Sequence, residues 1–171
     1  MAAEQIGNFV KSVITNPNLE ETWLNLSSLN MGDNEAMSLK AALSEKNNNI
    51  KVLNLSQNKF KETGIIAIFQ SLLNTKLDTF IIDGCLAPKT ISSEVIGKRI
   101  ATSLFSLLSN CPSIKTLSMS KSYDGRVILP LLENLAVNTT LIELDISENK
   151  VFILFLFYFY FLFFILFYFY F

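Results

Sequence analysis

The segment 50–60 reads IKVLNLSQNKF, and its pattern decides the fold. Leu53 and Leu55 alternate with polar residues, and Asn58 follows three residues later. Alternation with a period of two is typical of a half-buried strand. The amide of an Asn in the turn after such a strand can satisfy backbone groups that the turn leaves buried. We therefore interpret the segment as a short strand and a turn that Asn58 closes from the inside.

The same arrangement recurs along the chain: an apolar residue, a second one two positions later, and a turn position three residues after that. The five sets are Leu24-Leu26-Leu29, Leu53-Leu55-Asn58, Phe80-Ile82-Cys85, Leu117-Met119-Ser122 and Leu144-Ile146-Asn149. Their starts are 29, 27, 37 and 27 residues apart, so one interval contains an insertion. We place the insertion in the segment 86–94, LAPKTISSE, and expect a surface loop there.

Each pair of strand patterns is separated by a stretch in which apolar residues recur every three or four positions, as in an amphipathic helix. These stretches are EAMSLKAALSEK (35–46), GIIAIFQSLL (64–73), VIGKRIATSLFSLL (95–108) and RVILPLLENLAV (126–137). A strand and a helix every 27 to 29 residues are the signature of leucine-rich repeats. The sequence therefore predicts an α/β fold, a right-handed solenoid with a curved parallel sheet inside and helices outside. Pro130 predicts that the fourth helix starts near it or kinks there.

The turn positions predict a structural ladder along the inside of the solenoid, formed by Asn58, Cys85, Ser122 and Asn149. Leu29 holds the corresponding place in the first set, and its side chain cannot bond to backbone groups. We therefore expect the first unit to be irregular or terminal in character.

Three regions follow from this pattern. Residues 1–18 are expected to form the helix of a truncated repeat, because Ile6, Phe9, Val10 and Val13 share one helical face. Residues 19–150 hold about four repeats and a partial fifth. This organisation predicts that the chain is a fragment of a longer solenoid.

Residues 151–171 form an apolar, aromatic tail with ten Phe and four Tyr, which as a helix would be long enough to cross a membrane. Spanning helices use small residues for packing and place Tyr at the interfaces, whereas Tyr158 and Tyr160 would lie mid-membrane. The abundant residue types can all be encoded by A and T alone, and Val codons begin with GT, as introns do. We therefore favour translation into an AT-rich intron, and the alternative is a transmembrane helix.

Composition excludes several classes of function. The chain has no His, which excludes His-based triads, His metal sites and His pH switches. Cys85 and Cys111 form no CxxC motif, and no Gly-rich phosphate loop is present. The N-terminal sequence lacks the features of a signal peptide, which favours a cytoplasmic location. We therefore expect that the chain has no catalytic residue, metal or cofactor, and that it is not an enzyme.

A binding surface is the remaining candidate. In the repeat register, the residues between the buried strand positions face the concave side of the solenoid. This concave face consists of Trp23, Asn25, Ser27, Val52, Asn54, Ser56, Thr79, Ile81, Asp83, Thr116, Ser118, Ser120, Glu143, Asp145 and Ser147. It has three carboxylates and neither Lys nor Arg, so it suits a protein partner and not a nucleic acid. The residues predicted to bind are Trp23, Asn25, Asn54, Ile81, Asp83, Ser118, Glu143 and Asp145. Trp23 is the candidate anchor, and the alternative is that it covers the end of the core.

Within the repeat class, residues 23–150 resemble the leucine-rich-repeat region of the CARMIL family, linkers of actin capping protein and myosin I. The resemblance lies in IKVLNLSQNKF, in the long third unit LDTFIIDGCLAPKTISSEVIGKRIATSLFSLL and in PSIKTLSMSKSYDGRVILPLLENLAVNTTLIELDISENK. It also lies in their order, with the lengthened unit before a turn that ends in Ser122. The repeats are similar to those of ribonuclease-inhibitor-like proteins in general.

The resemblance implies a regulator of actin filament assembly in migrating cells, located at the cytoskeleton, cell cortex or plasma membrane. In that family a lipid-binding domain precedes the repeats, and dimerisation and capping-protein-binding segments follow them. No residue of the capping-protein motif matches a position in this chain. We expect a scaffold with protein partners, and the resemblance implies actin-regulatory proteins among them. Two alternatives stay open: a small leucine-rich-repeat protein anchored in the membrane by residues 151–171, and a GTPase-activating or inhibitor protein of the same fold.

Overall fold

A computed structural model describes residues 3–45, 48–73, 75–86, 93–122, 125–135 and 138–149. The expectations for the tail at 151–171, and for most of the inserted loop, concern residues outside these ranges. The helices are α1 (Ala3–Ile14), α2 (Asp33–Leu43), α3 (Glu62–Ser71), α4 (Glu94–Asn110) and α5 (Gly125–Leu135). The strands are β1 (Thr22–Asn25), β2 (Ile50–Asn54), β3 (Thr79–Ile81), β4 (Thr116–Ser118) and β5 (Glu143–Asp145).

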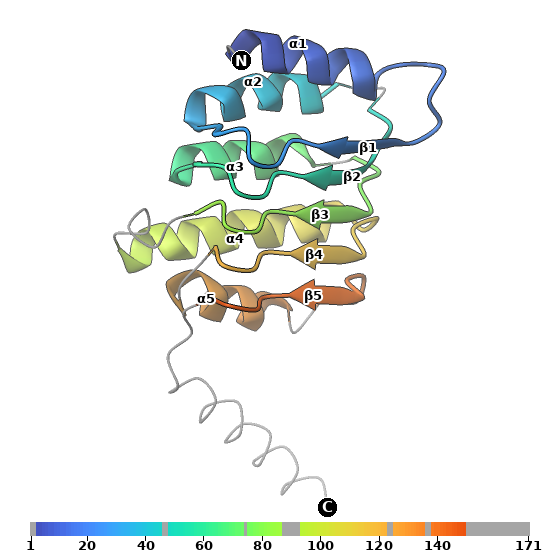
Figure 1. Cartoon of the computed structure of the whole chain (residues 1–171). Helices are drawn as coiled ribbons and strands as arrows, with labels where there is room; N and C mark the ends of the chain where they lie inside the picture. Colours follow the sequence, from blue (N-terminus) through green and yellow to red (C-terminus); the bar gives the residue numbers. More distant parts are fainter. Residues whose placement is uncertain are drawn as a thin grey trace, which may run out of the picture.

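The five strands form one parallel sheet in chain order, and the helices line one side of it (Figure 1). Strands and helices alternate, so each repeat contributes one strand and one helix and stacks on its neighbours. Short strands, one per repeat, paired in parallel with their neighbours, are the architecture of a leucine-rich-repeat solenoid. The fold predicted from the repeat pattern is confirmed.

The core lies between the sheet and the helices. Leu53, Phe80 and Leu117 occupy equivalent places on adjacent strands, and none of the three is exposed to solvent. The ring of Phe80 meets that of Phe69 on α3 edge-on, with centroids 6.1 Å apart, a geometry that aromatic pairs favour. Leu144, their counterpart on β5, is only partly buried.

The helices stack closely enough to require small residues. A Cβ atom at Gly64 on α3 would lie 3.1 Å from that of Ala36 on α2. Asp33 of α2 also accepts a hydrogen bond from the Lys61 backbone N–H at 2.8 Å, just before α3 begins. The Asp33 carboxylate therefore satisfies the Lys61 backbone N–H at the start of the next helix.

Of the two alternatives predicted for Pro130, the helix start is wrong, and the kink stays a prediction. α5 begins at Gly125 and continues past Pro130 to Leu135. A second difference lies in α4, which has 17 residues, whereas α3 has 10. Much of the extra length of the third repeat therefore lies on the helix side, and β3 and β4 keep their in-register pairing.

The first repeat is irregular in a way that the sequence pattern did not reveal. Leu29 is 49% exposed, whereas Met31 is 1% exposed and its backbone N–H donates to Asn58 Oδ1 at 3.0 Å. Met31 therefore occupies the ladder place, and the turn from Leu26 is two residues longer than the turn from Leu55 to Asn58. The apolar Met31 side chain fills the position without bonding to the backbone around it.

Candidate protein-binding face

Side chains at the ladder positions form hydrogen bonds to backbone groups of the turns that follow the strands. Asn58 is 4% exposed; its Nδ2 donates to Leu26 O at 2.9 Å and Leu55 O at 2.7 Å, while Oδ1 accepts from the Met31 N–H. It thus joins its own turn to that of the preceding repeat. Because these backbone groups are away from water, each bond also avoids the cost of an unsatisfied group.

The later ladder residues make the same type of link with different atoms. Asn149 Nδ2 donates to Met119 O at 2.9 Å and to Ile146 O at 2.8 Å, and its Oδ1 accepts from the Ser122 N–H at 2.9 Å. Ser122 is fully buried, and its Oγ lies 2.7 Å from Ile82 O and accepts from the Cys85 N–H at 3.1 Å. The ladder therefore uses amide or hydroxyl groups from successive repeats.

Cys85 is the sulfur-containing member of the ladder. Its Sγ lies 2.9 Å from Leu55 O, and the residue is 1% exposed. Burial raises the pKa of the Cys85 thiol to about 12, which outweighs the opposing hydrogen bonds from the Asn58 and Gln57 backbone. A thiol that stays protonated is a poor nucleophile, so Cys85 acts in packing and hydrogen bonding.

The residue before each ladder position has a left-handed backbone conformation, which the sequence pattern did not predict. These residues are Asn30 (φ 57°), Gln57 (φ 58°), Gly84 (φ 62°), Lys121 (φ 53°) and Glu148 (φ 54°). Gly84, and more weakly Asn30, carry residue types that signal a positive φ, whereas Gln57, Lys121 and Glu148 do not. The extended first turn adds a second such residue, Ser28, with φ 58°.

Several residues predicted to bind a partner lie in one row across the sheet. Asn25, Asn54, Ile81, Ser118 and Asp145 are in register at the ends of the five strands. Trp23 and Glu143 share the other outward-facing row, and Asp83 follows β3. The structure therefore brings the predicted residues together on one face.

Three residues of this row also close local turns, and each uses its Oδ1 atom as the acceptor. The pairs are Asn25 Oδ1 with the Ser27 N–H at 3.0 Å, Asn54 Oδ1 with the Ser56 N–H at 2.9 Å, and Asp145 Oδ1 with the Ser147 N–H at 2.8 Å. Their spacing, Asn or Asp followed two residues later by Ser, is visible in the sequence and typical of Asx-turns. For Asn25 and Asn54, this turn role competes with the proposed binding role.

Asp83 performs the same task for the next repeat. Its Oδ1 accepts from Ser118 Oγ and from the Ser120 N–H, each at 2.7 Å. Since Ile81 and Ser118 replace the Asn or Asp found elsewhere in the row, Asp83 supplies the missing acceptor for β4. One half-buried carboxylate thus fixes the path of the chain as it leaves the strand.

The concave face is apolar near β1. Trp23 is 77% exposed, and its register neighbour on β2 is the half-buried Val52. The alternative that Trp23 covers the end of the core is therefore wrong, because a covering ring would be largely buried. An exposed Trp on the open face of a sheet is a typical anchor for a protein contact.

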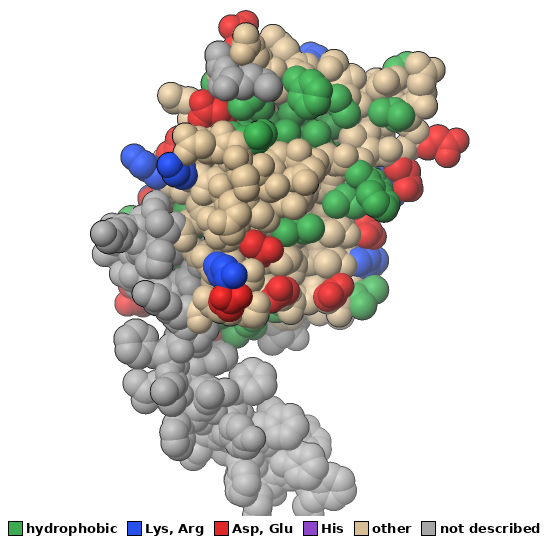
Figure 2. Space-filling view, viewed as in Figure 1, with side chains coloured by type: hydrophobic (Ala, Val, Ile, Leu, Met, Phe, Trp, Pro, Cys, Tyr) green, Lys and Arg blue, Asp and Glu red, His purple; other side chains and the backbone are tan. Residues whose placement is uncertain are grey.

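The opposite end of the face is acidic. Figure 2 shows Asp and Glu side chains gathered toward β4 and β5, and the exposed Glu143 and Asp145 belong to β5. Hydrogen bonds from the Ser147 backbone and hydroxyl hold the pKa of Asp145 below its usual value, so this carboxylate is ionised at neutral pH. The face therefore changes from apolar to anionic along the solenoid.

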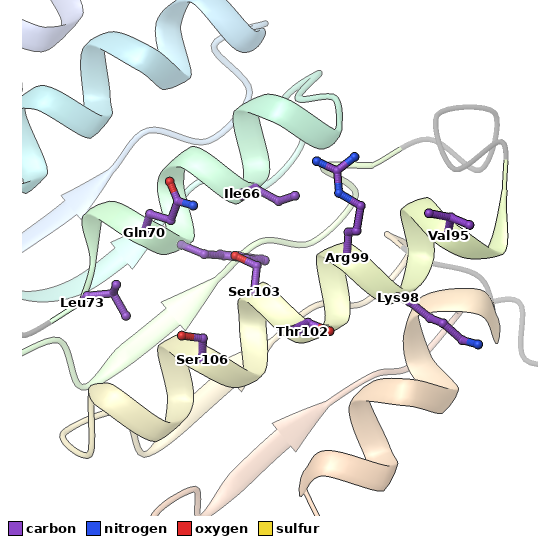
Figure 3. A pocket seen from close by; sticks show the side chains of 10 residues that line it. Ile66, Gln70, Leu73, Val95, Lys98, Arg99, Thr102, Ser103 and Ser106 are labelled. Carbon is purple, nitrogen blue, oxygen red and sulfur yellow. The ribbon is translucent and has the colours of Figure 1, made fainter.

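The helix side carries a shallow groove of about 590 Å³ between α3 and α4. Ile66 of α3, Leu73 just after α3 and the exposed Val95 of α4 contribute apolar surface, and Arg99 lies at its edge (Figure 3). Arg99 Nη1 lies 2.8 Å from Glu62 Oε1, so its charge is balanced within the chain. The groove therefore offers little unbalanced charge to direct a ligand.

The residues that the structure describes contain no group of three or more Cys, Asp or Glu residues arranged to hold a metal ion. None of their helices has the length and apolar character needed to span a membrane.

Comparison with known proteins identifies the repeats and a protein to which the chain is similar. A family profile described as "Leucine Rich repeat" matches residues 46–69 and 137–151. Protein CARMIL of Dictyostelium discoideum is 30% identical over an alignment of 153 residues, which covers 86% of this chain and 14% of that protein. The similarity to CARMIL indicated by the sequence is confirmed, and the chain spans about one seventh of the length of this relative.

Among solved structures, the C-terminal domain of tropomodulin from Caenorhabditis elegans has a similar fold. The TM-score is 0.58, and the match covers 86% of this chain and 83% of that domain at 15% sequence identity. At this identity the likeness concerns the fold alone, and it agrees with a leucine-rich-repeat solenoid.

Proposed function

We propose that this leucine-rich-repeat chain is a non-enzymatic protein-interaction scaffold and a fragment of a CARMIL-like regulator of actin filament assembly. The observation that carries the proposal is the open concave face, on which the largest exposed apolar side chain is Trp23 at 77% exposure. A solenoid presents such a face as an extended surface for other proteins. The 30% identity to CARMIL supplies the actin-regulatory context.

The same context supports a cytoplasmic location near the cell cortex. Its partners would be proteins of the actin system, with capping protein and myosin I the first to test because the resemblance names them. In that family, lipid binding and release of capping protein belong to segments outside the repeats, and we do not propose these activities for this chain.

Direct binding tests the proposal. The full chain, in a mild non-ionic detergent, is immobilised and exposed to purified actin filaments, capping protein or myosin I. We expect at least one to bind, and we expect Trp23→Ala to weaken that binding by at least tenfold, as loss of a hot-spot anchor does.

Val95→Ala is the matched control, because Val95 is also apolar and 67% exposed but lies on the helix side. It should leave the affinity unchanged. Failure of all three proteins to bind, or equal effects of the two substitutions, would refute the proposal.

A further inference from the structure

We infer that the concave face recognises a cationic peptide segment that carries one large apolar residue at one end. This inference rests on the proposed scaffold function and specifies the chemistry of its partner. The apolar residue packs against Trp23 near β1, and Lys or Arg residues lie over Asp83, Glu143 and Asp145 toward β5.

The apolar end is formed by residues of three neighbouring strands. Trp23 and Val52 are in register on β1 and β2, and Ile81 lies in the adjacent row on β3. Trp23 is largely exposed, while Val52 and Ile81 are half-buried. A planar indole beside smaller apolar side chains offers one large residue a site at which both partners lose water-exposed area.

At the acidic end, the positions that define the concave face carry no Lys or Arg. The positions of the concave face, all described in the structure, include Asp83, Glu143 and Asp145 but no Lys or Arg. Thr116 Oγ1 donates to Glu143 Oε2 at 3.4 Å, and the bonds to Asp83 and Asp145 come from Ser residues. Hydroxyl and N–H donors hold these carboxylates in place but leave their net negative charge available to a cation.

Nearby lysines contact other groups. Lys121 Nζ lies 3.0 Å from Glu148 Oε1, and Lys51 Nζ lies 3.8 Å from Glu21 Oε1. Lys115 Nζ lies 3.4 Å from the carbonyl oxygens of Pro112 and Thr140. Charge complementarity therefore favours a basic partner segment over an acidic one.

The strand spacing fixes the length of the segment. Neighbouring strands lie about 4.8 Å apart, so about 19 Å separates β1 from β5. An extended peptide advances about 3.3 Å per residue, so the basic residues should follow the apolar residue by about four to six positions.

The chain has a single Trp, so the selectively excited Trp emission reports this surface directly. The probes are Trp-free synthetic peptides with one Phe followed, five positions later, by three Lys residues. A matched peptide carries three Glu residues, and a third has Phe within the Lys cluster. Each is titrated into the full chain in non-ionic detergent at low and at high salt.

We expect the Lys peptide to shift Trp23 emission to the blue and to bind at least tenfold more tightly than the Glu peptide. High salt should reduce this preference, because exposed charges are screened. The peptide with the altered spacing should bind at least threefold more weakly than the Lys peptide.

The double substitution Glu143→Gln with Asp145→Asn removes two charges but keeps the side-chain shapes and the acceptor for Ser147. It should reduce the Lys-over-Glu preference to less than threefold. The control, Glu4→Gln with Glu20→Gln, removes two exposed charges outside the concave face and should leave the preference intact.

Equal binding of the Lys and Glu peptides would overturn the inference, as would an equal effect of the control substitutions. A blue shift caused by raising the concentration of the chain alone would overturn it in favour of a second copy. If a purified actin-system protein binds through Trp23 but the peptides show no charge preference, only the inference fails. If no such protein binds at all, the proposed function fails.

Discussion

At the scale of single residues, the solenoid depends on side chains that bond to backbone groups of two repeats at once. Asn58 does this with one amide, and its removal would leave the carbonyls of Leu26 and Leu55 and the N–H of Met31 without that partner. Because the site is buried, water cannot easily replace the lost bonds.

We predict that Asn58→Ala lowers the free energy of unfolding by about 3 kcal/mol, the sum expected when several buried groups lose a partner. Urea unfolding followed by circular dichroism measures this change. Asn8→Ala, at an exposed position of α1, should alter the free energy by less than about 0.5 kcal/mol. A loss below about 1 kcal/mol for Asn58→Ala would show that the ladder amide contributes little.

Cys85 gives the molecule a dependence on alkaline pH. In the unfolded chain its thiol ionises near pH 9.0, whereas burial raises the pKa in the folded chain to about 12. Below pH 9 both states carry the neutral thiol; above it, ionisation favours the unfolded state, so stability falls as the pH rises. Near pH 10 this loss amounts to about 1.4 kcal/mol.

We therefore predict that the difference in unfolding free energy between the natural chain and Cys85→Ser narrows by about 1.4 kcal/mol between pH 8 and pH 10. Urea titrations of both proteins at the two pH values test this, and the comparison cancels the titration of Tyr and Lys. A constant difference would show that the thiol ionises as readily in the folded chain as in the unfolded one.

The first ladder position shows why single residues are harder to predict than the repeat itself. Leu29 lies at the interval after Leu26 that the other repeats use, so the pattern selects it. The structure places Met31 there, because two additional residues are accommodated by left-handed backbone at Ser28 and Asn30. Nothing in the apolar pattern distinguishes the two positions, since both carry an apolar side chain.

At the scale of elements, the sequence predicts the strands and helices well because each has its own period and buries one face. The turns were predicted less well. Their left-handed positions carry mainly polar residues such as Gln57 and Lys121, which give no conformational signal. The register of the sheet, not the local residue type, imposes that conformation.

Gly84 is the left-handed turn residue that carries no side chain, and the side chain of Gln57 lies across it. We predict that Gly84→Ala lowers the free energy of unfolding by about 1–2 kcal/mol, through backbone strain and displacement of Gln57. Thermal or urea unfolding measures it.

Gly32→Ala is the matched control for this turn. Gly32 has a φ of −117°, and an added Cβ atom would come no closer than 3.6 Å to its neighbours. We expect a cost below about 0.5 kcal/mol, from the weaker helix cap alone. Equal costs at the two glycines would contradict the assignment of strain to the turn.

At the scale of the whole molecule, the repeats form one continuous core, and the tail stands apart in composition. Residues 151–171 contain Phe, Tyr, Leu, Ile and Val only. Apolar, aromatic runs of this length without charge favour intermolecular association in water.

We predict that the full chain aggregates in plain buffer and that a chain ending at residue 150 stays soluble, although with marginal stability. Size-exclusion chromatography with light scattering, with and without detergent, distinguishes the two. A monodisperse monomer of the full chain in plain buffer would contradict the prediction.

Sequencing of the transcript across codons 149–152 tests the related expectation of intron translation, because a spliced message that continues the repeat after Asn149 would support it.

The lengthened third repeat shows how the architecture separates two kinds of variation. β3 and β4 remain paired in register although the interval from Phe80 to Leu117 is ten residues longer than the interval from Leu53 to Phe80, and α4 grows to 17 residues on the other side. Insertions and deletions can thus accumulate on the helix side, while the residues of the concave face change by substitution. Protein engineers could accordingly graft tags or sensor modules between Leu86 and α4 and leave the ligand-facing surface as it is.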